Sequence, residues 1–310
     1  MARNNMTEES LMKRSKVCIL LLGVLYASLS VMGQDALPMA IQNEKPMGET
    51  KTLRSWHLLT DPILLDKQEV PSFIVDSINV IEDKEAVLKP FFEKLRDLKE
   101  GVSKEHFRVV HIGDSHIRGN MFPNQVRDRL QSVFGEYLEY ESLGINGATC
   151  LTFTNPRWIK QIKMMNPDLL ILSFGTNESH NRRYQSVVHF QQMDELVQLL
   201  IKENNSLPIL FTTPPGSYTS RRGRNRRRVY TKNQTTIHVT NSIKNYAHKR
   251  GYPIWDLFSV VGGENKACDN WVSAKLMRPD HVHFLPEGYE LQGDLLFQAF
   301  IKQFNEYAIR

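Results

Sequence analysis

A serine near one third of the chain and an aspartate and histidine near its end have the residue types needed for nucleophilic catalysis. Ser115 follows an apolar run and lies in the sequence Gly-Asp-Ser-His, and Asp280 and His283 lie in the sequence Asp-His-Val-His. A serine hydroxyl becomes an effective nucleophile when a positioned imidazole takes its proton and a third group holds that imidazole. We therefore predict Ser115 as nucleophile, His283 as general base and Asp280 as the orienting carboxylate.

The pattern of apolar runs indicates how these distant segments meet. From about residue 105 onward, short apolar runs alternate with stretches of helical spacing. This alternation predicts a parallel sheet covered by helices on both faces. Right-handed crossovers then favour a three-layer α/β/α sandwich. We expect a central sheet of five parallel strands, at residues 107–112, 137–143, 168–174, 208–213 and 252–257.

Short polar motifs follow the first three predicted strands. Ser115 follows the first, Gly144-Ile145-Asn146-Gly147 the second and Gly175-Thr176-Asn177 the third. In open parallel sheets, reactive groups gather beyond the carboxyl ends of the strands. Acyl transfer requires hydrogen-bond donors where negative charge develops. We expect an oxyanion hole formed by the backbone N–H groups of Ser115 and Gly147 and the side-chain amide of Asn177.

This combination of motifs resembles the SGNH hydrolase family, also called GDSL-type esterases, over roughly residues 105–308. The residues that give the family its name match Ser115, Gly147, Asn177 and His283, and Asp280 completes its Asp-x-x-His element. Gly144 is a rival to Gly147, but the Gly-x-x-Gly-x-Thr form favours the second glycine. The resemblance implies a flavodoxin-like sandwich and ester hydrolysis through an acyl-enzyme on Ser115, with no cofactor and no metal.

The motif details resemble one branch of that family in particular. His116 replaces the leucine of the common Gly-Asp-Ser-Leu form, and Glu178 follows Asn177. Both features are similar to the branch that contains bacterial peptidoglycan O-acetylesterases. The resemblance implies removal of O-acetyl groups from a carbohydrate or cell-wall polymer. The spacing between Gly147 and Asn177 leaves no room for the carbohydrate-binding module that this branch often carries. The alternatives are a lipase or other acylhydrolase, an O-acyltransferase, and a catalytically inactive glycan-binding module.

Positive charge and one tryptophan suggest how a substrate is held. The net charge is +5, and arginines crowd the stretch from Arg221 to Arg228, which we expect to be a loop because like charges repel at that density. Arg182 and Arg221 could give the crevice a positive rim that suits an anionic glycan. Trp271 could stack on a sugar ring, although a core tryptophan is the plainer interpretation. Thin aromatic interleaving argues against a nucleic-acid partner.

Further cysteines, histidines and acids near these motifs have less specific interpretations. Cys150 and Cys268 could form a disulfide in an exported protein or remain buried free thiols. Neither belongs to a CxxC pair, so we expect no zinc site built on them. Glu178 and His180 follow Asn177 closely; we expect them on a solvated loop, and the alternative is that they shape the pocket. A zinc hydrolase is the alternative mechanism, with candidate ligands Asp280, His281 and His283 joined by His111 or His116; otherwise the last two have a structural role near the site.

The N-terminal region is typical of an exported protein. Lys13, Arg14 and Lys16 precede an apolar stretch over residues 17–32 that ends near Gly33. This pattern predicts a signal peptide over residues 1–33 and a periplasmic or secreted protein; an uncleaved membrane anchor is the alternative. We expect residues 34–104 to be a lead-in with one helix at 84–98 that packs on the main domain, and residues 105–310 to form the hydrolase domain.

Overall fold

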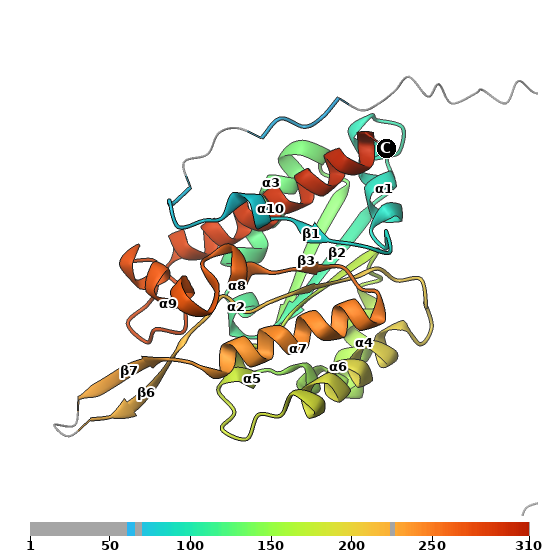
Figure 1. Ribbon diagram of the computed structural model, residues 1–310. Helices are drawn as coiled ribbons and strands as arrows, with labels where there is room; N and C mark the ends of the chain where they lie inside the picture. Colours follow the sequence, from blue (N-terminus) through green and yellow to red (C-terminus); the bar gives the residue numbers. More distant parts are fainter. Residues whose placement is uncertain (1–60, 66–69, 224–226, 310) are drawn as a thin grey trace, which may run out of the picture. The chain divides into compact units, whose positions relative to one another are not determined.

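A six-stranded, mostly parallel sheet forms the centre of the computed structural model, which describes residues 61–65, 70–223 and 227–309 (Figure 1). The strand order is β1-β8-β5-β4-β2-β3. The five predicted parallel strands are confirmed, and a short antiparallel strand, β1, pairs with β8 at one edge. The predicted signal peptide lies outside the described residues. The strands are β1 (Ile81–Glu82), β2 (Phe107–Gly113), β3 (Leu138–Gly144), β4 (Leu169–Ser173), β5 (Ile209–Thr212) and β8 (Ile254–Trp255).

Both faces of the sheet are buried, which explains why the strands read as continuous apolar runs. Adjacent strand residues point to opposite faces. Val109 and Ile171 accordingly belong to one hydrophobic core, and Val110 and Leu172 to the other. Figure 1 shows the two helical layers. The first core contains residues of α1 (Lys89–Lys99), α3 (Met121–Phe134) and α10 (Pro286–Ile309), and the second contains residues of α4 (Pro156–Met164), α6 (Ser186–Ile201) and α7 (Thr235–Arg250).

Short helices complete the structure at the ends of the strands. No helix among the described residues is long and apolar enough to cross a lipid bilayer. The bounds are η1 (Asp76–Ile78), α2 (Ser115–Arg118), η2 (Cys150–Thr154), α5 (Thr176–Ser179), α8 (Leu257–Val260) and α9 (Gly263–Ser273).

Residues before β2 are joined to the sheet by a buried asparagine. The Asn79 side chain accepts a hydrogen bond from Trp255 Nε1 at 2.8 Å and donates one to the carbonyl oxygen of Leu295 at 3.0 Å. Helix α1 adds the buried Phe91 and Phe92 to the core that also contains α10. The segment that precedes the catalytic motifs therefore shares its core with the main sheet.

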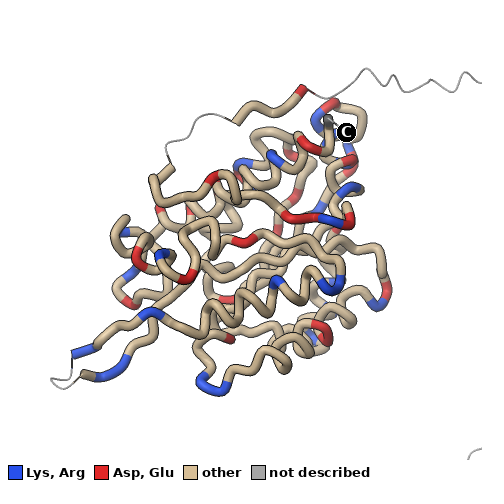
Figure 2. The backbone as a smooth tube through the Cα atoms, viewed as in Figure 1, with Lys and Arg blue, Asp and Glu red and all other residues tan. Residues whose placement is uncertain are grey.

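The arginine-rich segment differs from the predicted loop. It is the distal part of an antiparallel hairpin of β6 (Tyr218–Arg222) and β7 (Arg228–Lys232), and residues 224–226 at its tip lie outside the described part. Strand pairing is possible because α9 anchors the base of the hairpin: Asp269 accepts hydrogen bonds from Tyr218 Oη at 3.1 Å and Lys232 Nζ at 2.6 Å. Figure 2 shows the Lys and Arg residues that lie along the hairpin.

Candidate active site

Ser115 begins α2, immediately beyond the carboxyl end of β2. The Asp114 side chain caps this turn by accepting a hydrogen bond from the backbone N–H of His116 at 2.9 Å. The turn packs very closely against the neighbouring strand: a Cβ on Gly144, at the end of β3, would lie 2.1 Å from the backbone nitrogen of Arg118. This close contact fixes the position of the Ser115 hydroxyl above the sheet edge.

The three predicted catalytic side chains form one hydrogen-bonded chain. Ser115 Oγ lies 2.9 Å from His283 Nε2, and His283 Nδ1 lies 2.8 Å from Asp280 Oδ2. The His283 side chain is 32% exposed and that of Asp280 is 43% exposed, so these hydrogen-bonded side chains lie at the protein surface. A hydroxyl that donates to an imidazole, which in turn donates to a carboxylate, is the arrangement required for activating a serine.

The loop that carries Asp280 and His283 is held by its own backbone. Arg278 N–H donates to the carbonyl oxygen of His283 at 2.8 Å, and His281 turns the chain with a φ of +56°. Asp280 Oδ1 accepts the backbone N–H groups of Val282 and His283, each at 2.9 Å. Partial burial by itself would raise the pKa of Asp280, but these hydrogen bonds and the His283 imidazole lower it below its ordinary value. Asp280 therefore stays ionised beside His283.

A cavity of about 610 Å³ opens directly onto the Ser115 hydroxyl. Two of the predicted oxyanion-hole residues, Gly147 and Asn177, line the cavity. Arg118 and Arg278 also line it and give it positive charge. The complete lining is Ser115, Arg118, Gly119, Met121, Asn146, Gly147, Asn177, Arg278, His283 and Tyr289.

The two glycines after β3 have different roles. Gly144 is required by packing against α2, as described above. Gly147 has a φ of +74°, which favours glycine, and a Cβ there would meet no atom within 4 Å. Gly147 lines the cavity together with Ser115, whereas Gly144 is not among the lining residues.

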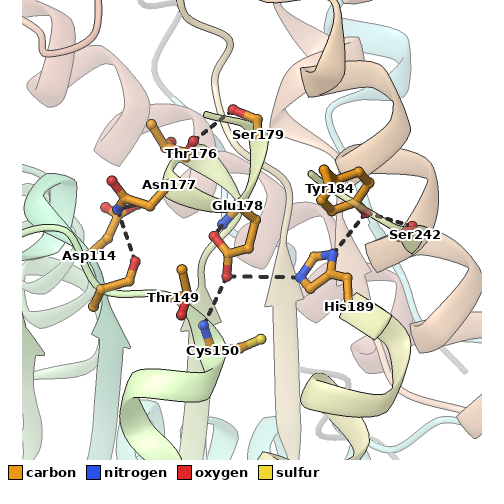
Figure 3. Close-up of polar contacts among 12 residues, drawn as sticks. Asp114, Thr149, Cys150, Thr176, Asn177, Glu178, Ser179, Tyr184, His189 and Ser242 are labelled. Carbon is orange, nitrogen blue, oxygen red and sulfur yellow. Dashed lines mark hydrogen bonds and ion pairs between the residues drawn. The ribbon is translucent and has the colours of Figure 1, made fainter. Parts of the chain in front are cut away.

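Asn177 is held through its amide nitrogen. Its Nδ2 donates to the carbonyl oxygen of Ala148 at 2.9 Å and lies 3.4 Å from Asp114 Oδ2, as Figure 3 shows. The first contact ties the segment after β3 to α5. Burial raises the pKa of Asp114 to about 8. A neutral Asp114 carboxyl attracts the Asn177 amide hydrogens less strongly than a carboxylate would, which leaves the amide available to an oxyanion.

The buried His111 and His116 are confirmed as packed residues near the site. The His116 ring lies 5.4 Å from the His283 ring, and its Nδ1 lies 3.1 Å from Tyr289 Oη. Burial lowers the pKa of both His111 and His116 to about 3. A neutral His116 adds no positive charge next to the catalytic imidazole.

The predicted substrate contacts need correction. Trp271 is fully buried, with its Nε1 donating to the carbonyl oxygen of Pro215 at 2.9 Å, so it belongs to the core and has no surface for a sugar ring. Arg182 and Arg221 are exposed but are not among the cavity-lining residues. The arginines that do line the cavity are Arg118, one helical turn after Ser115, and Arg278, two residues before Asp280. Their proximity to the two motifs was the signal that could have identified them.

The other histidine and cysteine hypotheses can now be compared with the geometry. His281 packs against the rings of Tyr218 and Tyr230, at 5.3 and 4.3 Å, and no metal-binding cluster among the described residues includes it or His283. The described cysteines, Cys150 and Cys268, are both free and buried. The zinc-hydrolase arrangement and the disulfide are therefore not what the structure assembles.

Glu178, expected on a solvated loop, is instead buried directly behind the site. Its Oε2 accepts the backbone N–H of Gly175 and its Oε1 that of Cys150, both at 2.9 Å. Gly175 is three residues before Glu178, but Cys150 is 28 residues before it, and that second contact could not be read from the sequence. One carboxylate thus joins the segment that contains Gly147 to the turn that contains Asn177 (Figure 3).

Comparison with known proteins gives a family and a fold. The family model described as the GDSL-like lipase/acylhydrolase family matches residues 111–291. A solved peptidoglycan O-acetylesterase has a TM-score of 0.65 at 16% identity, over 73% of this chain and 99% of that one. The acetyl xylan esterase AlAXEase has a TM-score of 0.50 at 18% identity, over 62% and 99%. A two-domain esterase active on acetylated mannans has a TM-score of 0.51 at 16% identity, over 74% and 57%. A search of the curated proteins found no match.

Proposed function

Because the chain belongs to the GDSL-like lipase/acylhydrolase family and is a serine esterase of the SGNH type, we propose that it hydrolyses O-acetyl esters on a carbohydrate polymer through an acyl-enzyme on Ser115. The observation that carries the proposal is the hydrogen-bonded chain from Asp280 through His283 to Ser115, with contacts of 2.8 and 2.9 Å. Ser115 and His283 line a cavity whose wall also contains Gly147 and Asn177.

In the first half of the reaction, Ser115 Oγ attacks the acetyl carbonyl carbon while His283 Nε2 takes the hydroxyl proton. The carbonyl π electrons move to the oxygen, which becomes an oxyanion held by the N–H groups of Ser115 and Gly147 and the amide of Asn177. Collapse of this intermediate breaks the bond to the sugar oxygen, and His283 returns its proton to that leaving group. Ionised Asp280 stabilises the imidazolium throughout.

In the second half, a water molecule attacks the acetyl group on Ser115. His283 takes a proton from the water, and the same donors hold the second oxyanion. When the bond to Ser115 Oγ breaks, His283 gives the proton back to that oxygen, so acetate leaves and the enzyme is restored.

Features around the cavity support a polymeric, anionic carbohydrate as substrate. The triad is open at the surface, which suits an acetyl group carried by a long chain. Arg118 and Arg278 line the cavity, and Tyr218 of the basic hairpin pairs with the catalytic loop through its N–H to the carbonyl oxygen of His281 at 2.9 Å. Charge of one sign beside a site attracts an oppositely charged substrate. Three structural neighbours act on peptidoglycan, xylan or mannan esters, as their names state.

The expected location agrees with such a substrate. The basic residues before the apolar stretch at residues 17–32 support a signal peptide over residues 1–33. We accordingly place the enzyme in the periplasm or outside the cell, with residues 34–104 as a lead-in to the hydrolase domain.

Hydrolysis of p-nitrophenyl esters tests the catalytic assignment. Wild type should hydrolyse the acetate ester faster than longer acyl esters, and Ser115→Ala should remove the activity while leaving the unfolding midpoint near that of wild type. A fluorophosphonate probe followed by peptide mass spectrometry should label Ser115. Wild-type turnover by Ser115→Ala, or labelling of another serine, contradicts the assignment.

Acetate release from polymers tests the substrate class. We expect release from acetylated anionic glycan to exceed release from an acetylated neutral glycan of equal acetyl content, and the difference to shrink with added salt. Equal release from both polymers at low salt contradicts a role for Arg118, Arg278 and the basic hairpin in attracting the substrate. Transfer of acetyl to an added sugar instead of water would reassign the enzyme as an acyltransferase.

A further inference from the structure

Three buried side chains with metal-binding donor atoms converge behind the oxyanion segment. Cys150 begins η2, Glu178 lies in α5 and His189 lies in α6 (Figure 3). One donor atom from each, a thiol sulfur, a carboxylate oxygen and a ring nitrogen, lies within 4.8 Å of the other two. None of these side chains takes part in the acyl-transfer steps described above.

The His189 ring presents an unpartnered nitrogen to this cluster. The residue is 2% exposed, and its Nδ1 lies 3.0 Å from Tyr184 Oη, whose hydroxyl donates to Ser242 Oγ at 2.8 Å. That direction makes the Tyr184 oxygen an acceptor for Nδ1–H, so Nε2 carries the free lone pair. Nε2 is buried without a hydrogen-bond partner, at 3.9 Å from Glu178 Oε1.

The lone pair of Nε2 therefore faces another acceptor. The Glu178 carboxylate is fixed by the backbone N–H groups of Gly175 and Cys150, which orient its oxygens toward the cluster. A buried ring nitrogen without a hydrogen-bond partner is unfavourable, and a cation between His189 Nε2 and the Glu178 carboxylate would remove that cost.

We propose that Cys150 Sγ, Glu178 Oε1 and His189 Nε2 bind a thiophilic divalent cation, with zinc as the best match. Zinc takes thiolate, imidazole and carboxylate ligands, whereas calcium and magnesium prefer oxygen alone. A thiolate and a carboxylate carry two negative charges, so the zinc complex is neutral, as its apolar surroundings require. The hydrogen bond from His189 to Tyr184 is the orienting contact that metal-bound histidines usually have.

The space allows such an ion with a modest rearrangement. Metal–ligand bonds of about 2.0–2.3 Å place ligands about 3.5 Å apart, so the three side chains close in by up to about 1 Å. A small cavity of about 10 Å³, which borders Cys150 and His189, gives these side chains room to move. Binding replaces the thiol proton, which passes to solvent, so the affinity falls as the pH is lowered.

No sequence motif indicates this cluster, because its three ligands come from separate elements. The metal would join η2, α5 and α6 directly behind the segments that carry Gly147 and Asn177. It would not touch the substrate, and we assign it a structural function: it holds the two oxyanion segments at a fixed separation.

Cobalt binding tests the proposal, because a thiolate bound to Co²⁺ gives a charge-transfer band in the near ultraviolet. Full-length protein is stripped with a chelator, checked for folding by circular dichroism, and titrated with Co²⁺ at pH 7.5. We expect one equivalent to produce the band, and one equivalent of Zn²⁺ to abolish it and raise the melting temperature. A folded wild type that gives no band and retains no zinc after dialysis overturns the proposal.

Matched variants assign the ligands. Cys150→Ser should lose the band and His189→Gln should weaken cobalt binding at least 10-fold, as ligand loss generally does. Cys268→Ser, which changes the other buried free cysteine, should keep the wild-type titration. A band that persists in Cys150→Ser, or that disappears only in Cys268→Ser, contradicts the site. Ser115→Ala should bind cobalt like wild type, so this result is independent of the esterase assignment.

Discussion

Gly144 lies so close to the backbone of Arg118 that a methyl group on residue 144 would be 2.1 Å from the Arg118 nitrogen and 2.6 Å from the carbonyl carbon of Ile117. Arg118 ends the single helical turn that Ser115 begins. The position of the nucleophile is thus set by contact between one strand end and one helical turn, neither of which can move without the other.

Gly144→Ala should consequently destabilise the protein and displace Ser115. Both atoms in the way are backbone, so relief requires a shift of α2, and overpacking of this kind costs about 2–3 kcal/mol. Urea unfolding and p-nitrophenyl acetate hydrolysis measure the two effects. The control is Gly119→Ala, whose new Cβ would meet only Ser115 O at 3.9 Å. A Gly144→Ala variant that is as stable as Gly119→Ala and as active as wild type would show that this contact does not position the nucleophile.

Asp280→Asn should reduce kcat about 10³- to 10⁴-fold with little effect on folding. Asparagine can still accept the N–H groups of Val282 and His283, but its amide nitrogen can face His283 Nδ1. The imidazole then carries its proton on Nε2 and cannot accept one from Ser115. Steady-state kinetics on p-nitrophenyl acetate measures the loss. Asp269→Asn, at the base of the hairpin, is the control; equal activity of both variants argues against a role for Asp280.

Arg222→Gln should weaken the interaction with anionic polymers and leave small esters unaffected. Arg222 is directly opposite Arg228 in the hairpin, and like charges at paired positions are destabilising. We expect a several-fold higher KM on an acetylated anionic glycan at low salt, unchanged kinetics on p-nitrophenyl acetate and slightly higher stability. Arg127→Gln removes the same charge from a partly exposed position on α3; if it raises KM equally, net charge and not the hairpin is responsible.

The buried His111 should make the protein less stable in acid. Burial lowers its folded-state pKa to about 3, so below an unfolded pKa of about 6.5 only the unfolded chain binds this proton. Its contribution is complete above about pH 6.5 and is lost progressively as the pH falls toward 3. His111→Gln can keep contacts with Tyr140 and Ser173 but lacks this titration.

Urea unfolding at several pH values isolates that contribution. The stability difference between wild type and His111→Gln should change by about 3 kcal/mol from pH 7 to pH 4, at about 1.4 kcal/mol per pH unit below 6.5. The exposed His238, changed to glutamine, is the control for replacing a histidine. A difference that does not vary with pH shows that His111 is not held neutral by the fold.

The sequence revealed those features that depend on local pattern. The five parallel strands were predictable because burial on both faces leaves long apolar runs, and Ser115 and His283 because each lies in a short motif beside a strand end or the last helix. Trp271 was ambiguous, since its burial depends on packing against Phe73 and Phe284 from distant segments.

Charged residues were the least predictable. The arginine run indicated a loop, yet Tyr218 and Lys232 anchor it to Asp269 and allow strand pairing. The burial of Glu178 was not predicted because its partner Cys150, 28 residues earlier, comes close only in the folded chain. Charge patterns describe the solvated chain, whereas these contacts arise from tertiary structure.

Strand β1 has a consequence for how the enzyme can be shortened. Ile81 and Glu82 cover the free edge of β8, and the helix that follows buries Phe91 and Phe92. A chain shortened to residues 105–310 would retain Ser115 and His283, but it would expose an unpaired strand edge beside an uncovered aromatic patch. Such edges associate with one another, so the shortened enzyme should aggregate on expression although its catalytic residues are complete.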